Sequence, residues 1–431
     1  MPVKIAPFWW EDSPRPNADE IELPQKTDIA VIGGGYSGLS AALVLARGGA
    51  TVTVFEAGVL GAGASTLNGG MVGPSFHKLG VVGLEKKYGL TKANEILQES
   101  IRFVDYLENF LTTEGIDADF KRTGRFRGAL RPNHYDDMAR QLEILQKSLS
   151  IEGKMLSKAD LHQETGSSLF CGGSIYPQDG RLHPAKYHDG LVQVARKAGV
   201  IIAAKTAVIG LTKTASGFSV KTARGDVQAT QIAVCTNGYT GPLTHDLRRR
   251  IIPLRSAMIA TAPIAPELMK QLMPKGRVYG DSRRLVTYYR PSPDGRRILF
   301  GSRASSLKDN PEANIHNLHA SLTEVFPQLA NVEITHTWSG LVAYTFDHVP
   351  HIGQFSEGKL KGMFYAMGYC GSGVARSTYF GSKLGLKMLG DPNSKTAFDD
   401  LTFETKPFYN GKPWFMPAVF AWHRLADRFG L

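Results

Sequence analysis

Cysteine is scarce in this chain: its 431 residues include only Cys171, Cys235 and Cys370. The three lie far apart and form no CxxC pair, so the sequence predicts neither a disulfide framework nor a metal centre. An odd, sparse set of cysteines is typical of a reducing compartment. The chain also has no run of 18 or more apolar residues, and we therefore expect no membrane-spanning helix.

Acidic residues are fewer than basic ones: the chain has 39 aspartates and glutamates and 50 lysines and arginines, which gives a net charge of +11. The basic residues form short scattered groups such as Arg248–Arg250, with no long arm and no aromatic-interleaved stripe, so no nucleic-acid partner is expected. The N-terminus, MPVKIAPFWWEDSPRP, lacks the layout of a signal peptide, which predicts a cytoplasmic location. A basic surface can still concentrate an anionic substrate.

The remaining composition is that of a globular protein. Hydrophobic residues make up 42% and charged residues 21% of the chain. A chain of this length usually folds into two or three domains of roughly 100–200 residues each. Collagen-like, disordered and small disulfide-rich classes are thereby excluded.

A βαβ unit opens the folded part of the chain. Residues 28–38 read DIAVIGGGYSG, a short apolar strand that runs into a glycine turn. A helix is predicted over 40–47, and Gly48-Gly49 ends it. The segment 51–55, TVTVF, is a β-branched strand that is followed by Glu56. Strand, helix and strand in about thirty residues form the unit that binds dinucleotides.

The glycine turn carries a dinucleotide fingerprint, Gly33-x-Gly35-x-x-Gly38, with Tyr36 and Ser37 between the last two glycines. The first glycine permits the tight turn, the second lets the backbone approach a pyrophosphate, and the third lets helix and strand pack closely. Glu56 follows 18 residues after Gly38, where an acidic side chain accepts hydrogen bonds from the adenosine ribose. The alternative is a coincidental glycine turn.

The sequence favours FAD over NAD at this site. We find one complete fingerprint, whereas a flavoprotein reduced by a nicotinamide usually carries a second one. A glycine-rich loop over 61–70 follows Glu56, and its hydroxyl and amide groups suit the pyrophosphate and the isoalloxazine ring. Its candidate cofactor-binding residues are Ala64, Ser65, Asn68, Gly69 and Gly70.

Hydrophobic periodicity and turn residues predict further elements along the chain. Helices are expected over 91–112, 135–150, 183–199, 374–389 and 419–428. Strands are expected over 124–131, 201–203, 218–222, 231–236, 251–261 and from 364. A hairpin is expected where Pro291-Ser-Pro-Asp-Gly joins 285–290 to 297–301.

Three more blocks accompany the fingerprint: VCTNGY at 234–239, WSG at 338–340 with DHVPHIG at 347–353, and GYCGSG at 368–373. Together they resemble the D-amino-acid oxidase-like (DAO) family of FAD-dependent amine and amino-acid oxidoreductases. The similarity is nearest to the branch that holds gamma-glutamylputrescine oxidase, glycine oxidase and monomeric sarcosine oxidase, and it covers nearly the whole chain.

The resemblance implies a mixed α/β and α+β fold. A Rossmann-related FAD-binding domain is interleaved with a substrate domain built on a mostly antiparallel sheet, and the flavin lies between them. The predicted boundaries are an N-terminal arm over 1–27, an FAD-binding domain over 28–80, 156–245 and 331–390, a substrate-binding domain over 81–155 and 246–330, and a tail with a docking helix over 391–431.

The resemblance also assigns cofactor contacts near the C-terminus. Asn237, Gly238 and Gly340 belong to the implied FAD site. Gly371, Ser372, Gly373 and Val374 would face the flavin pyrimidine, where a helix N-terminus stabilises the negative charge that develops at N1–C2=O. A simple helix-entry turn is the alternative for this last set.

The sequence departs from the sarcosine oxidase pattern in three ways. Residues 340–347 contain no cysteine, so we expect noncovalent FAD. Ala375 stands where that enzyme has a substrate-binding lysine, and Arg376 is one residue away. Residues 288–290, Tyr-Tyr-Arg, supply no clear equivalent of the lysine that activates oxygen, so oxygen and a quinone or other electron carrier both remain as acceptors.

The implied reaction is oxidation of a C–N bond in a small amine or amino acid by hydride transfer to flavin N5, which gives an imine that hydrolyses. The candidate catalytic residues are His77, Tyr288, Tyr289 and His351. Strand alternation lets only one of the two tyrosines face inward. Arg303 and Arg376 are candidates for a substrate carboxylate, with surface ion pairs as the alternative.

Several alternatives stay open on sequence alone. A quinone-linked or electron-transfer-linked dehydrogenase subunit would use the same first half-reaction, and a noncatalytic flavin-binding subunit would use none. Secondary amines, D-amino acids, imino acids, gamma-glutamyl polyamines and opines all remain as substrates. The tail over 413–428, which is apolar on one side and basic on the other, favours docking on its own domain over contact with a membrane surface.

Overall fold

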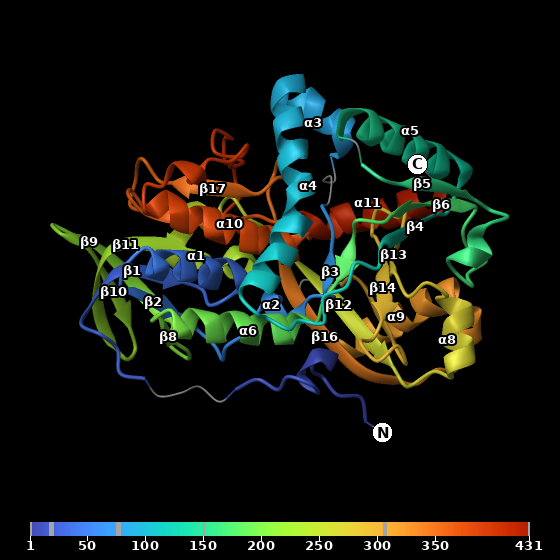
Figure 1. Cartoon of the computed structure of the whole chain (residues 1–431), viewed down its shortest axis with the longest axis horizontal. Coiled ribbons are helices and arrows are strands. Elements are labelled where there is room, and N and C mark those ends of the chain that lie inside the picture. Colours follow the sequence, from blue (N-terminus) through green and yellow to red (C-terminus); the bar gives the residue numbers. More distant parts are fainter. Residues whose placement is uncertain (1, 17–20, 75–78, 150, 305–307, 430–431) are drawn as a thin grey trace.

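The computed structural model describes residues 2–16, 21–74, 79–149, 151–304 and 308–429 (Figure 1). His77, one of the candidate catalytic residues, lies outside these ranges. The two large sheets occupy opposite halves of the molecule in Figure 1. The mixed α/β and α+β architecture expected from the sequence is thereby confirmed.

The first sheet contains the predicted dinucleotide-binding unit. Its central strand β1 (Lys26–Ile32) runs parallel to β2 (Val52–Phe55) on one side and to β11 (Gly225–Val234) on the other. The strand order is β17-β18-β11-β1-β2-β8, and the hairpin β9–β10 extends β11. The other strands are β8 (Ile201–Ala203), β9 (Val208–Thr214), β10 (Gly217–Thr222), β17 (His351–Gln354) and β18 (Phe364–Met367).

Helices α1 (Tyr36–Arg47) and α10 (Gly373–Met388) pack side by side at very short range, as Figure 1 also shows. A Cβ at Gly381 would lie 2.3 Å from the Ser37 carbonyl oxygen, and one at Gly385 would lie 2.8 Å from the Val44 side chain. Two glycines on one face of α10 therefore allow this contact. The contact fixes α1, which follows the fingerprint turn, against α10, which follows the glycine block at 368–373.

The second sheet is almost wholly antiparallel, as expected. Its order is β16-β12-β15-β14-β13-β4-β6-β5, and β13 with β4 is its parallel pair. The predicted hairpin is present, with Arg290 opposite Leu299. The strands are β4 (Arg125–Ala129), β5 (Lys154–Ser157), β6 (Gly172–Tyr176), β12 (Ile252–Thr261), β13 (Val278–Asp281), β14 (Tyr288–Pro291), β15 (Ile298–Arg303) and β16 (Ile334–Tyr344).

The remaining elements connect or cover the two sheets. Strands β6 and β16 belong to the second sheet, although the predicted FAD-binding segments 156–245 and 331–390 contain them; the domain boundaries stay a prediction. The helices are α2 (Ala64–Leu67), α3 (Gly80–Tyr88), α4 (Leu90–Thr113), α5 (Pro132–Leu149), α6 (Pro184–Lys197), α7 (His245–Arg248), α8 (Pro266–Leu272), α9 (Pro311–Val325) and α11 (Met416–Phe429), and β3 (Met71–Val72) pairs with β7 (Gly180–Arg181).

The tail helix α11 docks on its own chain. Met416 and Phe420 are buried in an apolar cluster with Ile252, Leu254 and Tyr344 of the second sheet. Burial of large apolar side chains stabilises such a contact by roughly 1.5–3 kcal/mol per side chain. Within the described ranges, every helix is too short or too polar to cross a bilayer.

Candidate active site

A cavity of about 1520 Å³ runs between the two sheets. The fingerprint turn, the glycine-rich loop and the ends of β2 and β11 line one part of it. Strands β4, β12, β14, β15 and β16 and the tail helix line the other part. We call the first part the nucleotide end and the second part the substrate end.

The fingerprint glycines lie where the sequence predicted, and each meets a different constraint. Gly33 has φ +109°, and a Cβ there would lie 2.9 Å from the Cys235 carbonyl oxygen. A Cβ on Gly35 would lie 2.9 Å from Ser65 Oγ. Gly38 faces away from the cavity, since its Cβ would lie 1.9 Å from the Gly33 carbonyl oxygen. Gly33, Gly35, Tyr36 and Ser37 line the cavity, and Gly38 serves helix–strand packing.

Glu56 stands at the end of β2 with both carboxylate oxygens held by the backbone. Oε2 accepts a hydrogen bond from Gly34 N at 2.9 Å, and Oε1 accepts one from Gly58 N at 2.9 Å. A carboxylate offers about four lone-pair sites, so two remain for ribose hydroxyls. The acid is therefore oriented before any nucleotide binds.

The glycine-rich loop is tied to the first turn of α1. Ser65 Oγ accepts a hydrogen bond from Tyr36 N at 3.1 Å. Asn68 Oδ1 accepts one from Gly70 N at 2.8 Å, which shapes the end of the loop. Ala64, Ser65, Asn68 and Gly69 line the cavity. Gly70 does not line the cavity: it has φ +65° and lies in a turn against the Leu182 carbonyl.

The later glycine blocks meet the same cavity. Asn237 takes φ +42°, and its Oδ1 accepts a hydrogen bond from Gly368 N at 2.9 Å. Gly238 faces away and packs on Leu341. The lining residues from these blocks are Asn237, Gly340, Gly371, Ser372, Gly373 and Val374. The start of α10 therefore faces the cavity that the fingerprint turn also lines.

The two tyrosines of β14 point to opposite faces of the second sheet. Tyr288 lines the cavity, and its hydroxyl lies 2.7 Å from Ser256 Oγ. Tyr289 is fully buried in the core, with its ring centroid 5.2 Å from that of Tyr279 and 5.4 Å from that of Phe300. The position of Tyr289 does not fit the catalytic role proposed from sequence, because alternation turns its ring away from the site.

His351 is likewise not among the residues that line the cavity. Its Nε2 lies 3.0 Å from Asp347 Oδ2, and its ring stacks on Phe403 at 4.1 Å. Burial raises the pKa of Asp347, but hydrogen bonds from His351 and Tyr88 outweigh it and lower the pKa to about 2. The buried pair fixes the turn before β17, and this position does not fit a catalytic role.

Sequence reasoning missed most of the charge at the substrate end. Arg303 and Arg376, the sequence candidates for binding a substrate carboxylate, both line the cavity. Four further arginines line it that the sequence analysis did not single out: Arg125, Arg127, Arg283 and Arg284. Tyr344, His348 and His423 were missed as well. A usable signal existed for one pair: Arg125 and Arg127 alternate on a predicted strand, so both point to one face.

Two of the three cysteines lie at the cavity wall. Cys235 and Cys370 line the cavity, whereas the sequence comparison had considered only residues 340–347. Burial raises the pKa of the Cys235 thiol to about 12 and raises that of Cys370 too. Thiols of this kind are protonated and weakly nucleophilic, so noncovalent attachment of the flavin stays our prediction.

These residues fit FAD. Gly35 lines the cavity without a side chain, and a Cβ there would lie 2.9 Å from Ser65 Oγ; the N-terminus of α1 suits a pyrophosphate. Glu56 suits a ribose, and the start of α10 suits the electron-rich edge of a reduced flavin. FAD supplies hydride-accepting chemistry when it is bound.

Comparisons with known proteins agree with this site. A sequence model of the family described as FAD dependent oxidoreductase (DAO) matches residues 28–384. The probable oxidoreductase OrdL of Haemophilus influenzae is 32% identical, over 88% of this chain and 86% of its own length. Gamma-glutamylputrescine oxidoreductase of Escherichia coli is 28% identical, over 94% and 93%.

The crystal structure of glycine oxidase from Geobacillus kaustophilus superimposes with a TM-score of 0.73 at 20% identity, over 89% of this chain and 99% of that chain. This likeness shows the same fold. The family match spans most of the chain and includes both glycine blocks that line the cavity. The chain therefore belongs to the DAO family of FAD-dependent oxidoreductases and is a flavin-dependent enzyme.

Proposed function

We propose that the enzyme oxidises the C–N bond of a small amine or amino acid that carries a carboxylate near the reacting carbon. The observation that carries this proposal is the place of Arg303. It lines the cavity, and a Cβ on Gly371 would lie only 3.3 Å from its Nη2. The names of two relatives, gamma-glutamylputrescine oxidoreductase and glycine oxidase, agree with an amine or amino-acid substrate.

Arg303 is held in position by an aromatic neighbour. Its guanidinium carbon lies 4.9 Å from the Tyr344 ring centroid, and it donates a hydrogen bond to the Tyr344 hydroxyl. No carboxylate of the described residues is within ion-pair distance of it. An arginine fork matches a carboxylate in geometry. A substrate acid bound there would place its neighbouring carbon beside the glycine turn at 371–373.

The rest of the substrate end aligns the amine and excludes water. Tyr288, which packs with Met258 against Gly69 and Gly301, forms part of the cavity wall. Bound FAD would supply the acceptor, at flavin N5, for the hydride that leaves the carbon next to the amine nitrogen. The resulting imine hydrolyses in water to a carbonyl compound and an amine. Alignment in a water-poor pocket is the main contribution that we assign to the protein.

An anaerobic substrate screen tests this proposal. Purified FAD-loaded enzyme is mixed with primary and secondary amines, with and without a carboxylate, and absorbance near 450 nm is followed. We expect carboxylate-bearing amines to bleach the flavin. Arg303→Gln should raise the KM for them, whereas Arg140→Gln on the exposed face of α5 should not. Failure of every amine to bleach the flavin would refute the proposal.

The segment 288–290 bears on the identity of the electron acceptor. Arg290 donates to the Leu182 carbonyl at 2.7 Å and lies 5.2 Å from the Trp9 ring centroid, so its charge is directed away from the cavity. This segment therefore supplies no cation for oxygen activation. We propose a quinone or another electron carrier as the alternative acceptor. Stopped-flow reoxidation that is fast with a quinone and slow with oxygen would support it.

A further inference from the structure

The charges that line the cavity are strongly unbalanced. Among the described lining residues there are six arginines and one acidic residue, Glu56. Glu56 sits at the nucleotide end, held by backbone amides. Five of the arginines come from the second sheet or its connecting loop, at the substrate end. A single substrate carboxylate bound by Arg303 leaves most of this charge unexplained.

Protein acids already neutralise two of the other arginines. Arg125 Nε lies 2.8 Å from the Asp179 carboxylate. Arg283 is bound by Asp281 at 3.3 Å and by Glu324 at 2.7 Å. These two guanidinium groups therefore have little charge left for a ligand.

Arg127 differs from them. Its guanidinium donates a long hydrogen bond, 3.4 Å from Nε to the Asp281 carbonyl oxygen. In the part of the chain that the structure describes, no carboxylate lies within ion-pair distance of it. Burial lowers the pKa of this guanidinium, which means that its charge is poorly solvated. An anion beside it would remove that cost.

The register of the sheet places Arg127 on the same face as Arg303. Arg127 is paired with Gly280, Gly280 with Tyr288, and Tyr288 with Gly301, two residues before Arg303. Directly paired residues share a face. The two arginines are thus separated by three strand spacings of about 4.8 Å, or about 14 Å across the sheet. Between them on this face lie Gly280 of β13, which has no side chain, and Tyr288 of β14, which lines the cavity.

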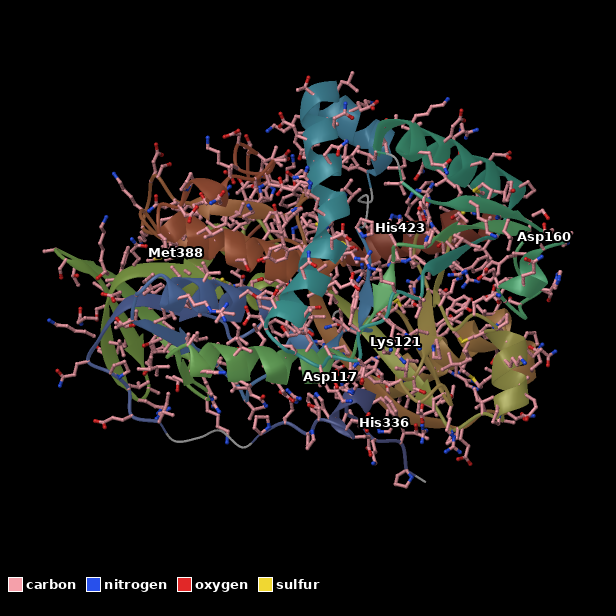
Figure 2. All side chains as sticks on the ribbon, viewed as in Figure 1. Asp117, Lys121, Asp160, His336, Met388 and His423 are labelled. Atoms are coloured by element: carbon pink, nitrogen blue, oxygen red, sulfur yellow. The ribbon has the colours of Figure 1, made fainter. Side chains whose placement is uncertain are left out.

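The tail helix encloses this part of the cavity. His423 of α11 lines it, and Figure 2 shows the position of His423 on that helix. Asp427 accepts hydrogen bonds from Arg284 N at 2.9 Å and Leu285 N at 3.3 Å. These bonds fasten α11 to the loop between β13 and β14. The helix lies beyond residue 384, where the family match ends.

We propose that Arg127 forms a second, distal anion site, so that the substrate is an amine bearing one carboxylate near the reacting carbon and another acidic group at its far end. This inference rests on the proposed function and specifies its substrate class. Arg303 binds the near acid, and Arg127 binds the far one beneath α11. Substrates with one acid alone bind more weakly because Arg127 stays uncompensated.

The test uses nonreactive ligands on the FAD-loaded enzyme. Saturated dicarboxylates from succinate to suberate, and monocarboxylates of the same length, are titrated while the visible flavin spectrum is followed. A charge-assisted hydrogen bond contributes about 1.5–3 kcal/mol, so the best dicarboxylate should bind about tenfold to a hundredfold more tightly than its monocarboxylate partner. The preference should peak at one chain length.

Variants assign the preference to a residue. Arg127→Gln should remove the gap between the two series and leave monocarboxylate binding unchanged, and Arg127→Lys should keep part of the gap. Arg140→Gln, which removes a charge outside the cavity, should preserve it. Equal binding of both series to the unmodified enzyme would overturn the inference. Loss of FAD from a folded Arg127→Gln variant would also overturn it, because the guanidinium would then serve the cofactor.

The two proposals fail in different ways. If dicarboxylates bind as expected but no amine bleaches the flavin, the distal site stands and the proposed reaction falls. If amines bleach the flavin but show no dependence on a second acid or on Arg127, the reaction stands and the distal site falls.

Discussion

The two ends of the cavity are built from different parts of the polypeptide. At the nucleotide end, backbone amides and glycines form the surface, and Glu56 is itself held by two backbone N–H groups. At the substrate end, side chains form the surface: Arg127, Tyr288 and Arg303 project from three strands of the second sheet.

This difference decides which substitutions each end of the cavity tolerates. A surface made of backbone is lost when a side chain is added to it, but it is indifferent to most other substitutions. A surface made of side chains on a rigid sheet changes its specificity one residue at a time, while the strands stay in place. We therefore expect changes at the nucleotide end to remove the cofactor, and changes at the substrate end to alter which ligand binds.

The largest effect is expected at the fingerprint turn. Gly35→Val should abolish FAD binding, because its Cβ would already lie 2.9 Å from Ser65 Oγ and its methyl groups would fill the space beside the α1 amides. The purified variant should be colourless, with no peak near 450 nm, and its far-UV circular dichroism should match that of unmodified apoprotein. A yellow, FAD-loaded variant would show that the pyrophosphate lies elsewhere.

The next largest effect is a pH dependence of stability that comes from one buried histidine. His183 is fully buried at the start of α6, where its Nδ1 accepts from Lys186 N at 3.1 Å, and burial lowers its pKa from 6.5 to about 4. The unfolded chain takes up this proton below pH 6.5, whereas the folded protein takes it up only near pH 4. Stability is therefore lost as the pH falls between these values, by roughly 3 kcal/mol.

Replacement of this histidine should flatten that dependence. His183→Asn keeps a side chain that can cap the helix but does not titrate. Between pH 7 and pH 4, its free energy of unfolding, measured by urea denaturation, should fall less than that of the unmodified protein. His162→Asn, a change at an exposed histidine, serves as the control. Equal slopes for all three proteins would contradict the prediction.

A smaller effect is expected at Glu56. In Glu56→Gln an amide replaces one carboxylate oxygen, so either Gly34 N or Gly58 N loses its acceptor and the ribose loses a charged partner. Hydrogen bonds to charged groups contribute about 1.5–3 kcal/mol, and the dissociation constant of FAD should rise about tenfold to a hundredfold. Fluorescence titration of apoprotein measures it, with Glu152→Gln as an exposed control. Unchanged affinity would exclude Glu56 from the ribose site.

The same contrast explains what could be predicted from sequence. Much of the nucleotide end comes from two short segments: Gly33 to Gly38 form one turn, and Ala64 to Gly70 form the short helix α2 and the turn after it. Local chemistry decides such segments, because a tight turn and a close backbone approach require glycine wherever they occur. The exceptions, Gly38, Gly70 and Gly238, were assigned to the right segments, but tertiary packing directs them away from the cavity.

The substrate end depends on pairings that no local pattern encodes. Arg127 and Arg303 share one face of one sheet because β13 and β14 pair in register between their strands. The 11-residue strand β16 and the helix α9 were not predicted. His351 was assigned to the site from the neighbouring motif, yet its partner Phe403 comes from the tail and draws the ring into the core.

The smallest effects distinguish the two neighbours on β14. Tyr288→Phe removes the hydroxyl that lies 2.7 Å from Ser256 Oγ at the cavity wall, and we expect a few-fold rise in KM or ligand dissociation constant, since one neutral hydrogen bond contributes about 1 kcal/mol. Tyr289→Phe should leave every kinetic constant unchanged, because its ring packs between Tyr279 and Phe300. The reverse order of effects would mean that the strand presents its other face to the substrate, and the shared face of Arg127 and Arg303 would be lost with it.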